Sequence, residues 1–262
     1  MRPPEWFKKL AVPLANKIVY ASDAYVGLKS TINEISNSLI DFSQPPAGSA
    51  DERLLEFAQL IRPWTNESLK LVRVGSSNDG GYVMADYLKV SHAISIGVGR
   101  NVSWDAEMAH RGVAVHLFDP TVRGLPNPVP RSTFHKIGLG PRSNGMNFKS
   151  LKEIVELSNP VGSSDTILKI DAEGAEWQAL ADSSSDFLLQ FSQVVIEFHD
   201  LRHLKDSTPA VTMLAAVKRL RETHFSIHAH ANNYGTLVRF NTYWFPDVLE
   251  VTFLRRDLLG NP

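Results

Sequence analysis

Short apolar runs alternate with amphipathic ones over most of the chain beyond residue 50. The apolar runs predict strands, and runs whose apolar residues recur at helical spacing predict helices. We expect strands at 93–96, 114–118, 133–137, 166–170 and 193–198, and helices at 51–61, 103–111, 150–157, 175–181 and 208–223. This βαβ order predicts an α/β domain around a mainly parallel sheet.

Two late runs, 224–230 and 248–255, alternate by twos and predict strands that end the sheet. The segment 120–131 between two expected strands contains four prolines, so it cannot be helical throughout. We expect this loop to replace a helix and to border a ligand pocket.

The first 43 residues also predict helix, and the Pro- and Gly-containing stretch 43–51 separates them from the rest. Apolar residues recur there at helix-like spacing with lysines between them, namely Trp6, Phe7, Leu10, Leu14 and Ile18, with Lys8, Lys9 and Lys17. Such a helix packs on its own domain or on a second copy of the chain. The alternative is a weakly basic helix on a membrane surface. We therefore divide the chain into an N-terminal helical extension with a linker, 1–50, and a domain, 51–262.

Charge and composition disfavour several classes of protein. The formal net charge of -1 gives no broad basic field, so nucleic acid is not expected as a partner. The chain has no cysteine, which excludes disulfides, thiolate metal sites and a cysteine nucleophile. No apolar run reaches the roughly 18 to 20 residues of a transmembrane segment, and no signal-peptide pattern is evident. We expect a cytoplasmic protein, with peripheral membrane association through the N-terminal helix as the alternative.

A glycine turn follows the strand expected at 93–96. The run AISIGVGRNVSWDAEM places Gly97, Gly99 and Asn101 before a helix that Ser103 can cap. Glycines let the backbone approach a ligand, and a helix N-terminus offers free N–H groups. Twenty residues after Gly99, the next strand ends in Asp119, whose carboxylate can accept hydrogen bonds from both ribose hydroxyls. We predict that these glycines, Asn101 and Asp119 bind a nucleoside-containing cofactor, and a plain tight turn is the alternative.

One position of this turn narrows the cofactor class. A dinucleotide-binding fingerprint has a third glycine near position 102, where this chain has Val102. Valine at this position disfavours pyrophosphate binding and favours a mononucleoside-type cofactor without phosphates.

Acidic residues gather where the strand expected at 166–170 ends. The stretch ILKIDAEGAEWQAL is an apolar strand that runs into Asp171, Glu173 and Glu176, and such strand ends form the ligand-binding rim of open α/β sheets. The following strand ends in Glu197 and His199. We expect Asp171, Glu197 and His199 to be catalytic, with His199 as the general base because histidine titrates near neutral pH.

The same side chains allow other interpretations. Asp171, Glu197 and His199 offer carboxylate oxygens and an imidazole to a divalent cation. Glu173 and Glu176 alternatively serve only as acids that favour the dipole of the next helix. For His199 the structural alternative is a histidine that is hydrogen-bonded at a strand end.

Two polar segments are candidates for substrate binding. In RVGSSNDGGYV, Asp79 and Tyr82 can line the cofactor or acceptor pocket, or the segment can be a simple hairpin turn. In HAHANNYG, alternation puts His228 and His230 on one face of a strand end. We predict that His230 and Asn233 bind hydroxyl groups of an acceptor, and a polar hairpin loop is the alternative.

Taken together, these segments resemble the FkbM-type family of S-adenosylmethionine-dependent methyltransferases. The resemblance covers roughly 71–256 and rests on a strand-borne Lys-x-Asp-x-Glu-Gly-x-Glu signature and a later strand that ends in Glu, here Lys169, Asp171, Glu173, Gly174, Glu176 and Glu197. It implies a Rossmann-like class I methyltransferase fold, with a seven-stranded, mainly parallel sheet and an antiparallel final hairpin. It also implies S-adenosylmethionine as the cofactor, Asp119 as its ribose ligand, and methylation of a hydroxyl on a sugar, glycan or other natural product.

The chain departs from the family pattern in the glycine turn. Ile96 precedes Gly97 where the family commonly has an acidic residue, and Val102 stands where a further glycine is common. These departures concern the methionine end of the cofactor more than the fold.

Two other functions stay open. An NAD(P)-dependent Rossmann oxidoreductase would use the same sheet, although the missing third glycine and the KIDAEGAE block disfavour it. A non-catalytic binding module with a methyltransferase fold would use the N-terminal helices as its interface. For the enzyme we expect a small-molecule or glycan acceptor, and homo-oligomer formation through the N-terminal helices is a further expectation.

Overall fold

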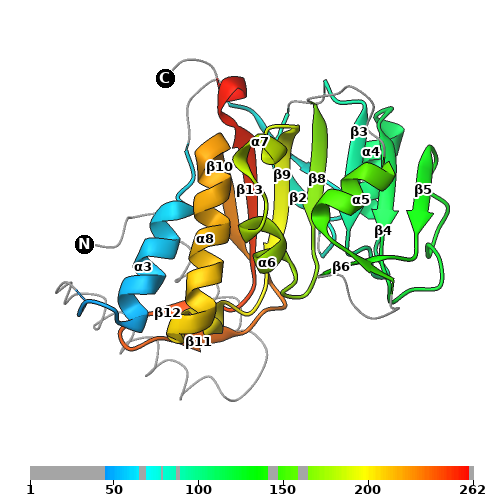
Figure 1. Ribbon diagram of the computed structural model, residues 1–262. Coiled ribbons are helices and arrows are strands. Elements are labelled where there is room, and N and C mark those ends of the chain that lie inside the picture. The colour runs from blue at the N-terminus through cyan, green and yellow to red at the C-terminus, as the bar shows by residue number, and fades with distance from the viewer. Residues whose placement is uncertain are drawn as a thin grey trace.

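The computed structural model describes residues 45–64, 69–77, 79–86, 89–140, 147–158 and 165–259. Its centre is a seven-stranded sheet in the order β10-β13-β9-β8-β3-β4-β5 (Figure 1). The strands are β3 (His92–Ile96), β4 (Ala114–Phe118), β5 (Ser132–His135), β8 (Thr166–Ile170), β9 (Phe191–Phe198), β10 (His224–Ala231) and β13 (Leu249–Arg255). All neighbours are parallel except that β13 runs antiparallel to both β9 and β10. The predicted α/β class and mainly parallel sheet are confirmed.

The two ends of the sheet differ in detail from the prediction. β10 and β13 pair antiparallel, but their connection contains a separate two-stranded sheet, β11 (Leu237–Arg239) and β12 (Trp244–Pro246). They are therefore not joined as a simple tight hairpin. At the other end, β5 stops at His135 instead of continuing to residue 137, because the chain then forms the short β6 (Gly138–Leu139), which pairs with β7 (Phe148–Lys149).

Side chains alternate between the two faces of the sheet, and each face has its own core. On one face, Ile94, Ile96 and Leu168 pack in a core with α3 (Ala50–Leu60), α5 (Leu151–Ser158), α6 (Glu176–Ala181), α7 (Ser185–Leu188) and α8 (Ser207–Thr223). On the other face, Ala93 and Val115 pack against α4 (Ser103–His110) and the antiparallel pair β1 (Leu71–Val74) and β2 (Tyr82–Ala85). The short helices η1 (Leu201–Lys205) and η2 (Arg256–Leu259) follow β9 and β13. The layers are visible in Figure 1.

Helix α3 is tied firmly to the rest of the domain. Phe57 is fully buried and makes edge contacts with the rings of Trp177, Phe198 and Phe245. The carboxylate of Asp51 accepts a hydrogen bond from the Thr242 backbone N–H at 3.0 Å. The helix that was expected at 51–61 therefore belongs to the α/β domain, whereas the helices predicted within 1–43 lie outside the described residues.

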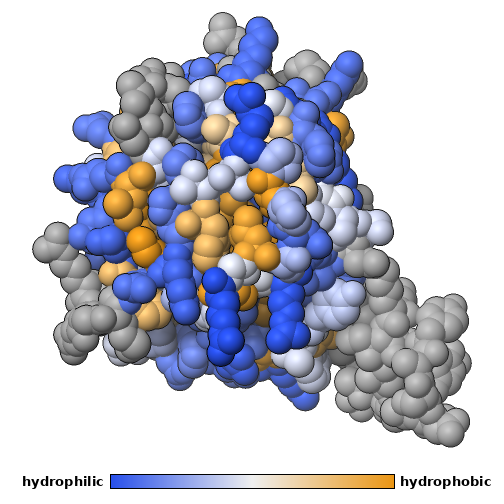
Figure 2. All heavy atoms as spheres, turned by 90° about the vertical axis from the view of Figure 1, so that its right-hand side faces the viewer, coloured by the Kyte–Doolittle hydropathy of each residue, from blue (hydrophilic) through white to orange (hydrophobic). Residues whose placement is uncertain are grey.

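The β5 edge of the sheet faces the viewer in Figure 2. Apolar side chains reach the surface in the middle of this face, and hydrophilic side chains surround them. Such a polar surround is one way in which proteins protect an exposed edge strand from pairing with other chains. Among the described residues, no helix combines the length and apolarity that a membrane crossing requires.

Topology places several predicted residues at one edge of the sheet. Since β3, β4, β8 and β9 are parallel, their carboxyl ends share this edge. β10 is antiparallel to β13, which is antiparallel to β9, so β10 also ends there. The loop 119–131 after β4 contains no helix within its described residues, as its prolines predicted.

Candidate functional site

A cavity of about 510 Å³ opens at the carboxyl ends of β3, β4, β8 and β9. Eight of the residues predicted to form the site line it, namely Asp79, Tyr82, Gly97, Gly99, Asn101, Asp119, Asp171 and Glu197. His199, His230 and Asn233 do not line it. Residues that are distant in sequence thus meet around one space, whose volume suits a small-molecule ligand.

Gly97 permits the close approach of two strands. A Cβ atom at this position would lie 1.5 Å from the carbonyl oxygen of Asp171, and the backbone φ is +78°. The Gly97 N–H donates to Phe118 O at 2.9 Å, and the Asp171 N–H donates to Ile96 O at 2.9 Å. Glycine is therefore required here by packing between β3 and β8. At Gly99, by contrast, an added Cβ would meet no atom within 4 Å.

Asp119 holds the glycine turn in place. Its Oδ2 accepts hydrogen bonds from the N–H groups of Val98 (3.0 Å) and Gly99 (2.8 Å). Its Oδ1 accepts from the Thr121 N–H (2.7 Å), the Thr121 hydroxyl (2.6 Å) and the Val122 N–H (3.3 Å). Burial alone would raise the pKa of Asp119, but these hydrogen bonds outweigh it and lower the pKa. The carboxylate is thus ionised and shapes the turn beside the cavity.

The segment between β1 and β2 forms the hairpin connection that was one of its two predicted roles, and it also contributes to the cavity wall. The Asn101 side chain donates to Asp79 O at 2.5 Å and accepts from the Ser103 N–H at 3.1 Å. A Cβ at Gly80 would lie 2.3 Å from the Asn101 amide nitrogen. Asn101 therefore fastens the β1–β2 connection to the glycine turn.

The prediction that Ser103 caps α4 was wrong. The residue before the helix is Val102, whose side chain makes no capping hydrogen bond, and the first N–H of the helix, that of Ser103, donates to Asn101 Oδ1. The Ser103 hydroxyl instead donates to Gly80 O at 3.1 Å and accepts from the Ser76 N–H at 3.0 Å. The Ser103 hydroxyl thus contacts the β1–β2 connection instead of capping the helix.

A buried tyrosine joins the two carboxylates at the ends of β8 and β9. The Tyr82 hydroxyl lies 3.4 Å from Asp171 Oδ2 and 3.3 Å from Glu197 Oε2. Burial, followed by the charges of Asp171 and Glu197, raises the pKa of Tyr82 well above its usual value. Tyr82 therefore stays protonated and donates. Glu197 Oε1 accepts a second hydrogen bond, at 2.7 Å, from the Asn232 amide at the end of β10.

Glu176 holds two parts of the site together by hydrogen bonds. Its fully buried carboxylate accepts from the His199 N–H at 2.9 Å and lies 3.2 Å from His199 Nδ1. Its other oxygen accepts from the Gly174 N–H at 2.9 Å. Trp177 Nε1 donates to His199 O at 2.9 Å. The first turn of α6 thus fixes both the acidic turn after β8 and the His199 ring.

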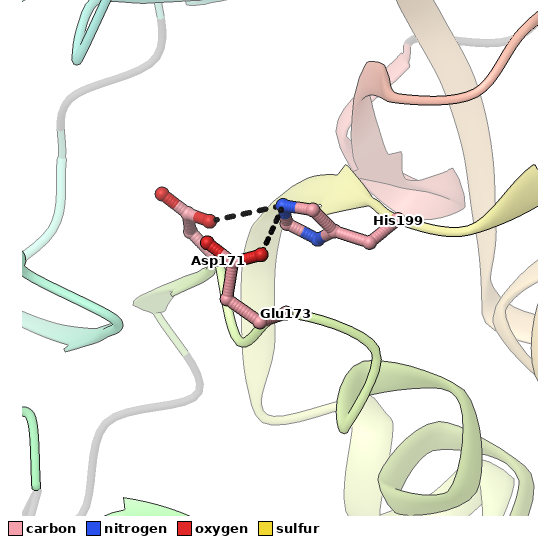
Figure 3. A group of neighbouring side chains, drawn as sticks. All are labelled: Asp171, Glu173 and His199. Atoms are coloured by element: carbon pink, nitrogen blue, oxygen red, sulfur yellow. Dashed lines mark ion pairs between the residues drawn. The ribbon is translucent and has the colours of Figure 1, made fainter. Parts of the chain in front are cut away.

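The His199 ring points into a group of carboxylates (Figure 3). Its Nε2 lies 3.6 Å from Asp171 Oδ1, 3.7 Å from Glu173 Oε2 and 3.7 Å from Glu197 Oε1. Burial would lower the pKa of His199, but the hydrogen bond and charge of Glu176, together with Asp171 and Glu197, raise it to about 9. With a pKa of about 9, His199 is protonated at neutral pH and cannot accept another proton.

Glu197 is the more suitable proton acceptor. It lines the cavity, whereas His199 does not. Burial and the neighbouring Asp171 raise its pKa to about 7, against the opposing effect of His199 and Lys169. A carboxylate with such a pKa can take a proton near neutral pH.

A polar row extends from Glu197 across the sheet. Glu250 of β13 lies opposite Glu197, and His230 of β10 lies opposite Glu250. Burial, and then Glu197, raises the pKa of Glu250 to about 8, while Arg73 lowers it. His230 thus lies in register with Glu250 and Glu197 across the sheet, whereas Asn233 is exposed. Sequence reasoning missed Glu250, although an acidic residue within the apolar run LEVTFL was a usable signal.

Two parts of the cavity wall differ in chemistry. The glycine turn supplies backbone groups beside Asp119, and the ends of β8 and β9 supply carboxylates. Lys169 is engaged within the wall, since its Nζ donates to Gly97 O at 2.8 Å and lies 5.3 Å from the Tyr82 ring centre. Among the described residues, Asp171, Glu173 and His199 form the group that can hold a metal ion.

No protein-family model matches this chain, and no curated protein matches it significantly.

Proposed function

We propose that this chain is an S-adenosylmethionine-dependent O-methyltransferase of the Rossmann-like class I fold, related to the FkbM type. The proposal is supported by the seven-stranded, mainly parallel sheet with its antiparallel β13, which agrees with the fold that the KIDAEGAE signature implies. The acidic end of β8 lies on the same cavity as the glycine turn after β3. A nucleoside and a reacting centre can therefore occupy one space.

The observation that carries the proposal is the charge of the cavity wall. The acidic lining residues are Asp79, Asp119, Asp171, Glu173 and Glu197, whereas the basic ones are Arg100 and Lys169. A sulfonium cation is stabilised by such a wall, while the pyrophosphate of a dinucleotide is repelled by it. The charge therefore favours S-adenosylmethionine over NAD(P), in agreement with Val102 in place of a third glycine.

The geometry supports Glu197 as the general base. S-adenosylmethionine bound in the cavity would supply the methyl group, so that the acceptor oxygen would form a new O–C bond as the S–C bond breaks and S-adenosylhomocysteine leaves. Glu197 takes the hydroxyl proton, and Tyr82 and Asn232 hold its carboxylate in position. Positioning and proton removal are the main tasks of an enzyme for this reaction.

Calorimetry with S-adenosylhomocysteine and with NAD⁺ tests the cofactor class. We expect saturable binding of S-adenosylhomocysteine and none of NAD⁺ at the same concentrations. Binding of NAD⁺ alone would support the oxidoreductase alternative. If neither ligand binds, the non-catalytic binding module becomes the better reading.

We also propose an acceptor class, a cellular location and a role for the N-terminal helices. The polar row of Glu197, Glu250 and His230 suits recognition of a polyhydroxylated acceptor such as a sugar, a glycan or another natural product. We propose that the protein acts in the cytoplasm. Homo-oligomer formation or peripheral membrane association through the N-terminal helices is an additional proposal.

A further inference from the structure

The imidazole of His199 is held in one orientation from behind. Its Nδ1 faces Glu176 Oε1 at 3.2 Å, and Glu176 is fully buried. The His199 side chain is 9% exposed. A histidine that ligates a metal is commonly held in this way, because a hydrogen bond from one ring nitrogen to a carboxylate orients the other nitrogen.

The other ring nitrogen, Nε2, faces carboxylates but makes no hydrogen bond with them. Within the described part of the chain, His199 Nε2 has no hydrogen-bond partner, and its nearest carboxylate oxygens are Asp171 Oδ1 at 3.6 Å and Glu173 Oε2 and Glu197 Oε1, each at 3.7 Å. These separations are too long for hydrogen bonds. Two donor atoms on one cation lie roughly 3.0 to 3.6 Å apart if metal–ligand bonds are about 2.1 Å. The observed spacing is close to that range.

Movement of one exposed side chain can close the remaining gap between the three ligand atoms. The ligand atoms of Asp171, Glu173 and His199 all lie within 4.8 Å of one another. The Glu173 side chain is 86% exposed, so its carboxylate can shift by the roughly 1 Å that coordination of one cation requires without disturbing the core. The three side chains converge from the turn after β8 and from the end of β9 (Figure 3).

We propose that Asp171, Glu173 and His199 form a binding site for one divalent transition-metal cation, such as Mn²⁺ or Zn²⁺. A nitrogen ligand beside two carboxylates favours these cations over Mg²⁺ and Ca²⁺, which prefer oxygen alone. A bound cation balances the negative charge of the surrounding carboxylates. Cation binding does not depend on methyl transfer.

The site also has a consequence for the proposed reaction. Asp171 and Glu173 line the cavity, so a cation between them and His199 faces the space where an acceptor binds. Its free coordination positions can then hold the acceptor oxygen and polarise its O–H bond. This consequence rests on the proposed function, whereas the metal site does not.

Titration of the metal-stripped full chain with Mn²⁺, followed through the EPR signal of the free ion, tests the site. We expect one saturable Mn²⁺ per chain and displacement by Mg²⁺ only in large excess. In Glu173→Gln we expect at least about tenfold weaker binding, since the loss of even an outer partner commonly costs that much. This variant changes an exposed side chain, so it tests the site even if His199→Ala fails to fold.

The matched control is Glu156→Gln, which changes an exposed glutamate of α5 away from the site, and it should bind Mn²⁺ as the unmodified chain does. Absence of saturable Mn²⁺ binding, or equal affinity in the Glu173 and Glu156 variants, overturns the site. Calorimetry with S-adenosylhomocysteine on the same protein separates this failure from a failure of the proposed function.

Discussion

At the scale of single residues, the candidate site depends on carboxylates with different tasks. Asp119 is saturated with hydrogen bonds from the two turns around it, so it acts on a ligand mainly by shaping the backbone. Glu176 is buried and binds the backbone of Gly174 and both the backbone and the ring of His199. Glu197 faces the cavity, and its oxygens are held by Tyr82 and Asn232.

Substitution of Asp119 and of Glu197 should therefore separate binding from turnover. Asp119→Asn leaves only one acceptor oxygen for two sets of donors, so we expect about tenfold weaker binding of S-adenosylhomocysteine, equivalent to about 1.4 kcal/mol. Glu197→Gln cannot accept a proton, so we expect turnover to fall about 100-fold or more with binding largely retained. Calorimetry and methyl-transfer assays measure the two effects. Equal losses of binding in both variants would show that the roles are wrongly assigned.

At the scale of the elements, the site depends on how closely β3 approaches β8. The parallel register places Ile96 beside Ile170, and the chains then separate around Gly97 and Asp171. The 1.5 Å distance that a Cβ at Gly97 would have to the Asp171 carbonyl oxygen leaves no space for a side chain. The glycine turn and the acidic turn are consequently one packed unit.

Gly97→Ala should be much more harmful than Gly99→Ala. The first must push apart β3 and β8 and break backbone hydrogen bonds, so we expect a loss of roughly 3 kcal/mol or more in the free energy of unfolding. The second meets no atom within 4 Å and has φ at +56°, so only the left-handed backbone penalty of roughly 1 to 2 kcal/mol applies. Urea unfolding of both variants measures the difference. Similar losses would mean that the strand ends can separate easily.

At the scale of the whole molecule, a buried histidine of the central sheet makes the free energy of unfolding depend on pH in acid. His224, at the start of β10, is fully buried. Its Nε2 faces Phe191 O at 2.9 Å, and its Nδ1 faces the Thr223 hydroxyl at 2.7 Å. Burial, assisted by the charges of Arg255 and Arg256, lowers the pKa of His224 to about 4, although the Phe191 carbonyl and Asp257 oppose the shift.

This shift predicts a loss of stability between about pH 6.5 and about pH 4. The pKa of His224 is lower in the folded chain than the unfolded value of about 6.5, so its contribution is complete above that pH and is lost as pH falls toward 4. Between pH 7 and 5 the loss is about 2 kcal/mol. Urea unfolding should show a smaller pH dependence in His224→Gln than in the unmodified chain. Substitution of His110, exposed at the end of α4, is the control, and an equally reduced dependence in His110→Gln would contradict the assignment.

Local patterns were sufficient to predict most of the central elements. Period-two and helical spacing located β3, β4, β8, β9, β10 and β13 and most of the helices on the described chain, because these patterns reflect which side chains are buried. The predicted end of β5 was wrong because the chain leaves β4 after His135 and forms β6, which pairs with β7 instead. The cap at Ser103 was wrong because its hydroxyl binds Gly80 and Ser76 instead.

The sequence by itself determined the α/β class, the positions of the glycine and acidic turns, and the candidate carboxylates. Which of these side chains share a cavity was decided only by the tertiary structure, because strand order and side-chain packing depend on contacts between distant segments. The structure placed Tyr82 and Asn232 on Glu197, Glu250 opposite it, and Glu176 behind His199. These contacts surround His199 with carboxylates, and this crowding of negative charge is the physical reason why it retains its proton and Glu197 becomes the proposed base.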